Sequence, residues 1–135
     1  MSSPITTPRA ITELDHVRLS NLLSRQPVVA ADLADVLDNA DLVPTAEIAS
    51  DIVTMNSRVR VADPRTGAER LLTLCYPADA DPAAGRLSVL SPAGAGLLGL
   101  RVGARVQWHG ADGLPVVAEL REILYQPEAS GDLLR

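Results

Sequence analysis

The segment LSVLSPAGAGLLGLRVG, residues 87–103, decides the fold that this sequence predicts. It begins with the apolar residues of a buried strand and continues into a short helix. Ser91 is a favourable helix N-cap, because its hydroxyl accepts a hydrogen bond from a free backbone N–H of the first turn. Pro92 suits the first helical position, where a missing N–H costs nothing. Gly99 suits the left-handed conformation that ends a helix. The segment therefore predicts a strand, a capped helical turn and a second tight turn.

Two glycines inside this predicted helix need a separate explanation. Gly94 and Gly96 lie between its cap and its last leucines. Each glycine in a helix costs about 1 kcal/mol relative to alanine. A short helix that tolerates both needs its backbone close to another group. Two candidates remain open at this point, the neighbouring sheet and a partner protein.

The composition is that of a folded domain with few aromatic residues. The chain has 135 residues, of which 47% are hydrophobic, enough for one ordinary domain or two small ones. Its aromatic residues are Tyr76, Trp108 and Tyr125, or 2% of the chain. The core must therefore consist of aliphatic side chains. A site that holds ligands or bases between aromatic rings is disfavoured.

The negative charge is concentrated in the first third of the chain. The net charge is −5, and residues 1–51 hold eight acidic residues against three arginines. The remaining residues hold nine of each sign. This distribution disfavours non-specific binding to nucleic acid and suits a basic protein surface or channel.

The sequence excludes an internal disulfide and holds no candidate membrane span. Cys75 is the only cysteine, and its apolar neighbours favour a buried thiol over a nucleophile. No stretch approaches the roughly 20 apolar residues of a membrane helix. Residues 1–10 lack the basic and then apolar pattern of a signal peptide. We therefore expect a cytoplasmic protein.

Two short helices are predicted after a flexible N-terminus over residues 1–11. Thr12 begins the first helix, with Asp15 at capping-box spacing, and Pro27 ends it. The second helix is predicted from Val29 to Leu42. The apolar face of the first consists of Leu14, Val17 and Leu22, with Leu19 and Leu23 as further candidates; that of the second consists of Leu33, Val36, Leu37 and Ala40. At about 14 residues and about 21 Å each, they predict a short antiparallel helical hairpin, a coiled coil, over residues 12–43.

Short strands follow over residues 51–126. A turn over residues 63–67, with Asp, Pro and Gly in the order that turns favour, predicts a hairpin over 58–76. Together the strands predict a mostly antiparallel sheet of about five strands with one short helix, so the fold class is α+β. Residues 127–135 form an irregular tail, which we expect to cover a sheet edge.

Several of these stretches resemble the Gre transcript-elongation factor family. The resemblance rests on residues 51–59, 86–94, 97–99 and 102–103, which look like the C-terminal domain of that family. The short hairpin, Tyr76-Pro77 and the ending YQPEASGD at residues 125–132 make the chain most similar to the branch that regulates nucleoside diphosphate kinase. The resemblance implies an FKBP-like C-terminal domain. It also implies docking on the rim of the secondary channel of RNA polymerase, with the hairpin pointing into the channel.

The resemblance also assigns candidate sites to the chain. The RNA polymerase docking element falls on Leu90, Ser91, Pro92 and Gly94. The alternative is that Ser91 and Pro92 form only a helix cap. The hairpin tip or effector element comprises Gln26, Pro27, Val28, Asp32 and Asp35. Cleavage factors of this family carry acidic residues at the tip that hold a catalytic Mg²⁺, whereas no adjacent acidic pair is present here.

The expected function is therefore a regulator of RNA polymerase without transcript-cleavage activity. We expect no catalytic residues, cofactor or metal site, no sequence-specific nucleic-acid contact and a monomeric protein. An active cleavage factor is the first alternative, and an FKBP-like prolyl isomerase or other protein-binding module is the second. The few aromatic residues disfavour the isomerase pocket. His16 and His109 lie outside any phosphate-binding glycine loop, so we interpret both as surface side chains.

Overall fold

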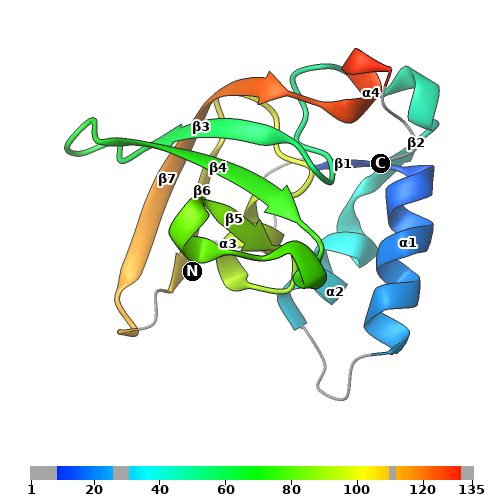
Figure 1. Cartoon of the computed structure of the whole chain (residues 1–135), viewed down its shortest axis with the longest axis horizontal. Coiled ribbons are helices and arrows are strands. Elements are labelled where there is room, and N and C mark those ends of the chain that lie inside the picture. The colour runs from blue at the N-terminus through cyan, green and yellow to red at the C-terminus, as the bar shows by residue number, and fades with distance from the viewer. Residues whose placement is uncertain (1–8, 26–30, 110–111, 132–135) are drawn as a thin grey trace.

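A computed structural model describes residues 9–25, 31–109 and 112–131 of the chain. The fold is α+β, with two short helices preceding a curled five-stranded sheet (Figure 1). In chain order the elements are β1 (Ala10–Thr12), α1 (Glu13–Ser24), α2 (Ala31–Asn39), β2 (Asp41–Val43), the 3₁₀ turn η2 (Thr45–Glu47), β3 (Arg58–Ala62), β4 (Glu69–Cys75), the 3₁₀ turns η3 (Pro77–Asp79) and η4 (Pro82–Ala84), β5 (Arg86–Ser88), α3 (Pro92–Leu97), β6 (Arg105–His109), β7 (Pro115–Tyr125) and α4 (Pro127–Ser130).

The main sheet has five strands and is mostly antiparallel, as expected, but one parallel pair makes it a mixed sheet. Its strand order is β5-β4-β3-β7-β6, and β4 and β5 pair in parallel. The chain between them passes through η3 and η4 and crosses back, so β5 runs in the same direction as β4. The other pairs are antiparallel. Register shifts between β3 and β7 increase the local twist, and the sheet curls around α3.

The predicted β3–β4 hairpin is confirmed. Strand β3 pairs with β4 from Arg58↔Thr73 to Ala62↔Glu69. The turn is closed by the Asp63 carboxylate, which accepts from the backbone N–H of Arg65 at 2.7 Å, and Gly67 has a positive φ of 77°. The turn residues predicted this geometry because each suits its position in the turn.

One hydrophobic core unites the helices and the sheet. Leu19 of α1 and Leu33 and Leu37 of α2 belong to the same buried cluster as the inward side chains of the strands and of α3. The helical pair is therefore integrated into the core rather than standing off it as a separate coiled coil. Within α1 the predicted face is rotated, because Val17 is 57% exposed whereas Leu19 is fully buried.

A second, two-stranded sheet at the base of the helical pair was not predicted. Strands β1 and β2 pair in parallel, from Ala10↔Asp41 to Thr12↔Val43. Strand β1 directly precedes α1 and strand β2 follows α2, so their pairing holds the two ends of the helical pair together. Three-residue strands carry too little alternation to be recognised in a sequence. Leu42, assigned to the second helix, lies in β2 and is exposed.

Candidate docking turn and helical pair

The turn between β5 and α3 is held by local hydrogen bonds. We call residues 88–92 the docking turn. The Ser91 Oγ accepts from the backbone N–H of Gly94 at 3.1 Å and donates to the carbonyl of Ser88 at 2.7 Å. The Ser88 Oγ in turn accepts from the N–H of Leu90 at 3.0 Å. The predicted N-cap is confirmed, and Pro92 is exposed at the first helical position.

The two glycines of α3 are explained by contacts within the protein. A Cβ on Gly94 would lie 2.0 Å from the carbonyl oxygen of Ser88. A Cβ on Gly96 would lie 2.9 Å from Cγ2 of Val106 on β6. Of the two alternatives, the neighbouring backbone and sheet therefore account for both residues. Gly94 is itself buried, and because it has no side chain, the carbonyl of Ser88 can lie against the first turn of α3.

The other end of α3 is held by a residue that the sequence did not single out. The guanidinium of Arg9 donates to the carbonyls of Ala95, Gly96 and Leu98 at 3.3, 2.9 and 2.8 Å. Carbonyls at the end of a helix lack partners within the helix, and a positive charge there is favourable. Residues 9–11, assigned from the sequence to a flexible N-terminus, are thus part of the fold.

Asp15 is a buried carboxyl that joins α1 to the sheet domain. Its Oδ2 accepts from the backbone N–H of Met55 at 3.1 Å, and its own N–H donates to the Oγ1 of Thr12 at 3.0 Å. The helix cap by Thr12 is confirmed, but the carboxylate does not complete a capping box. Burial raises the pKa of Asp15 to about 6, although the Met55 N–H lowers it. The negative charge of Glu128 raises this pKa further, and Arg18 lowers it.

The segment after β7 packs against the chain that precedes β3. The side-chain amide of Gln126 donates to the carbonyls of Ala49 and Ile52 at 2.8 and 2.7 Å. Its carbonyl oxygen accepts from the N–H of Ala129 and so caps α4. The Oγ1 of Thr54 donates to Oε1 of Glu128 at 2.7 Å. In its described part, residues 127–131, the predicted irregular tail thus forms the short helix α4, which is fixed to residues 49–54 through Gln126 and Glu128.

The predicted hairpin tip is described only in part. Gln26, Pro27 and Val28 lie outside the described residues. Asp32 and Asp35 are exposed on α2. In the part of the chain that the structure describes, no group of three or more His, Cys, Asp or Glu side chains is placed to hold a metal ion.

The cysteine is accounted for by packing. Cys75 is buried, as predicted, and its thiol donates to the carbonyl of Leu87 at 3.4 Å. Burial, with the negative charge of Asp79, raises the pKa of this thiol and disfavours the reactive thiolate. His16 is half-buried on α1.

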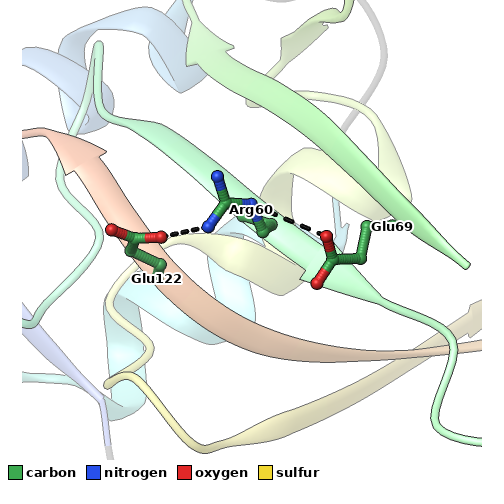
Figure 2. Close-up of polar contacts among 3 residues, drawn as sticks. All are labelled: Arg60, Glu69 and Glu122. Atoms are coloured by element: carbon green, nitrogen blue, oxygen red, sulfur yellow. Dashed lines mark hydrogen bonds and ion pairs between the residues drawn. The ribbon is translucent and has the colours of Figure 1, made fainter. Parts of the chain in front are cut away.

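The exposed face of the sheet carries paired charges. Arg60 on β3 lies between Glu69 of β4, at 3.8 Å, and Glu122 of β7 (Figure 2). Glu119 of β7 pairs similarly with Arg105 and Arg121. These arginines are compensated by neighbouring carboxylates, so they do not form the basic stripe that tracks a nucleic-acid backbone.

Comparison with known proteins identifies the family. Residues 48–125 match the family described as "Transcription elongation factor, GreA/GreB, C-term". The chain belongs to the GreA/GreB family. It is a homologue of the "Regulator of nucleoside diphosphate kinase" of Escherichia coli (strain K12), with 41% identity over 128 residues, 92% of this chain and 94% of the relative.

Solved structures of the GreA/GreB family share the fold. The "Prokaryotic transcription elongation factor GreA/GreB from Nitrosomonas europaea" superimposes with a TM-score of 0.75 and 35% identity, covering 89% of this chain and all of that one. GreA factor homolog 1 of Thermus thermophilus, at 20% identity and a TM-score of 0.52 over 87% of this chain and 99% of its own, shares the fold alone. Within residues 9–25, 31–109 and 112–131, none of the helices has the length and apolar character needed to cross a bilayer.

Proposed function

We propose that this GreA/GreB-family chain is a non-enzymatic regulator that binds RNA polymerase at the rim of its secondary channel. The docking turn makes the contact, and the helical pair occupies the channel entrance. The observation that supports this most is the internally hydrogen-bonded turn that exposes Pro92, on the domain that matches the family. Because its hydrogen bonds are internal, the turn needs no rearrangement to meet a partner.

The helical pair is too short to reach the catalytic centre of RNA polymerase from the rim of the channel. Helices α1 and α2 have 12 and 9 residues, shorter than predicted. At 1.5 Å per residue they span about 18 Å and about 14 Å. The exposed face of α2 carries Asp32, Asp35 and Asp38. A short acidic pair suits competition for the basic entrance of a channel rather than delivery of a metal ion to a deep site.

The proposal also includes an effect on nucleoside diphosphate kinase. The homologue in Escherichia coli is named a regulator of that enzyme. We infer that this chain affects the level of the enzyme through transcription.

Binding to purified RNA polymerase core enzyme tests the docking proposal. Wild-type protein is expected to be retained in a pull-down with the core. The variant Pro92→Arg is expected to be lost, because it alters the exposed turn and leaves the Ser91 cap intact. The matched control Leu114→Arg places the same charge on a residue that precedes β7 and is 63% exposed, and it should bind like wild type. No retention of the wild type would refute the proposal.

Transcript cleavage separates this proposal from an active cleavage factor. Backtracked elongation complexes incubated with the protein and Mg²⁺ are expected to show no shortening of the transcript. Robust shortening would contradict the proposed role of the helical pair and would assign the protein to the cleavage factors.

A further inference from the structure

Three stretches that the docking proposal does not use meet at the first turn of α1. They are residues 51–57, Tyr76 after β4, and residues 125–128 at the end of β7. Asp15 accepts a hydrogen bond from Met55 of the first stretch, and Glu128 accepts one from Thr54 of the same stretch. In Figure 1, α4 lies beside the start of α1 at the upper right. Segments from the two ends and the middle of the chain thus converge on one site.

Hydrogen bonds connect α1, residues 52–57 and residues 126–128. The carboxylate of Asp15 holds the N–H of Met55 at 3.1 Å, and the preceding residue, Thr54, donates its hydroxyl to Glu128 at 2.7 Å. The hydroxyl of Thr54 also lies 3.0 Å from that of Ser57, which accepts from the N–H of Thr54 at 2.9 Å. Gln126 anchors the base of α4 to Ile52. Helix α1 and helix α4 are therefore both bonded to the same loop, at the adjacent residues Met55 and Thr54.

The charges at this site are not balanced. Asp15 of α1 is 4% exposed, and it faces Glu128 of α4, Arg18 of α1 and Tyr76, whose hydroxyl oxygen is shut off from solvent. Burial raises the pKa of Tyr76, and the negative charge of Asp15 raises it further. Two carboxylates thus share the neighbourhood of one guanidinium. Repulsion between them opposes the contacts, so the orientation of α1 depends on both its hydrogen bonds and its charge.

We propose that Asp15, Thr54 and Glu128 form a clasp that fixes the orientation of the helical pair on the sheet domain. Asp15 and Glu128 are positioning residues, since they touch no partner in this scheme. The functional consequence rests on the proposed function, because the clasp then aims the helical pair relative to the docking turn. The clasp itself is a property of the free protein and is testable without polymerase.

Distance measurements between spin labels test the clasp in the full-length protein. Labels at Val17→Cys on α1 and at Leu114→Cys, the residue before β7, in a Cys75→Ala background, report the orientation of α1. Thr54→Val and Glu128→Ala each remove the Thr54–Glu128 bond, and both should broaden the distance distribution. The control Glu13→Gln removes an exposed charge from the same turn of α1 and should leave the distribution unchanged.

Glu128→Gln separates the clasp from a general effect on folding. Glutamine keeps an oxygen that accepts from Thr54 but removes the charge that faces Asp15. The distribution should remain as narrow as in the wild type, and the pKa of Asp15, measured by carboxyl NMR, should fall. A general effect of substitution at residue 128 on folding would instead broaden the distribution in both Glu128→Ala and Glu128→Gln. Unchanged distributions in both Thr54→Val and Glu128→Ala would overturn the clasp.

Polymerase assays connect the clasp to the proposed function. Glu128→Ala should bind the core enzyme like wild type but displace another secondary-channel ligand about tenfold less well, the size expected when one hydrogen bond to a charged group is lost. Equal displacement by the variant and the wild type would contradict the positioning role. Failure of the wild type to bind would refute the docking proposal alone, since the spin-label result stands independently.

Discussion

The docking turn and the base of the helical pair are built in different ways. The docking turn is held by bonds that span two or three residues, between Ser88, Leu90, Ser91 and Gly94. The base of the helical pair is held by bonds from Asp15 to Met55 and from Arg9 to α3, 40 and 86 to 89 residues apart. The turn can therefore keep its shape without the pair, whereas the pair depends on the sheet domain for its orientation.

The largest expected loss of stability comes from a substitution at Gly94, where the docking turn packs closely against α3. Gly94→Ala places a methyl group 2.0 Å from the carbonyl oxygen of Ser88, a backbone atom that cannot move freely. We expect it to lower the free energy of unfolding by at least about 3 kcal/mol, measured by urea denaturation. The control Gly113→Ala meets no atom within 4 Å, although its φ is 80°, and should cost about 1 kcal/mol. Equal losses in the two variants would refute the close approach.

A change of similar size in the free energy of unfolding is expected at Asp15, at the base of the helical pair, and it depends on pH. The pKa of Asp15 is raised from 3.8 to about 6 in the folded protein, so folding favours the protonated carboxyl. The contribution of Asp15 to stability is therefore fully present below pH 3.8 and is lost as the pH rises through about 6. The two-unit shift corresponds to about 3 kcal/mol. Asp15→Asn keeps an acceptor for Met55 but has no such dependence. The free energy of unfolding of the variant should therefore rise relative to wild type between about pH 3.5 and about pH 7.5.

Glu13→Gln is the control for this pH series. It removes an exposed carboxylate from the same turn and should retain the wild-type dependence. Parallel curves for wild type and Asp15→Asn would show that Asp15 is not buried against Met55 in the folded protein.

An intermediate effect is expected at the far end of α3. Arg9→Met removes three hydrogen bonds to the last carbonyls of the helix and retains much of the side-chain volume. We expect a loss of about 2 kcal/mol in the free energy of unfolding, from chemical denaturation. Arg70→Met, at an exposed position on β4, should change it by less than about 0.5 kcal/mol. A loss at Arg9 no larger than this control would contradict its bonds to α3.

The smallest effect tests the cap of the docking turn. Ser91→Ala leaves the N–H of Gly94 without its acceptor and should cost about 1 kcal/mol. Amide hydrogen exchange at Gly94 should accelerate while exchange at Met55 stays unchanged, because the two regions are held independently. Faster exchange at both sites would show that the turn and the base of the pair are coupled. Ser20→Ala, an exposed change on α1, serves as the control.

Local features of this fold could be predicted from the sequence because their causes lie within a few residues. The Ser91 cap, the Thr12 cap and the β3–β4 turn all follow from side chains that bond their own neighbourhood. Gly99, with a φ of 81°, follows a helix that its own conformation helps to end. The family resemblance rests in large part on the region around α3, where short stretches of sequence determine the local structure.

Long-range features could not be predicted because nothing near them in the chain marks them. Asp15 has the spacing of a capping box, yet its carboxylate bonds a backbone N–H that lies 40 residues away. Arg9 lies in a polar stretch with no periodic pattern, and its acceptors are backbone carbonyls. The parallel pairing of β4 with β5 depends on the path of the crossover, which residue preferences do not determine.

Photocrosslinking to RNA polymerase tests the central claim most directly. A photoreactive amino acid placed at position 92, in the docking turn, is compared with one at position 114, just before β7, with purified core enzyme. We expect a crosslink from position 92 to a polymerase subunit at the secondary-channel rim and none from position 114. A crosslink from position 114 alone, or none from position 92 under conditions in which the protein binds, would contradict docking through this turn.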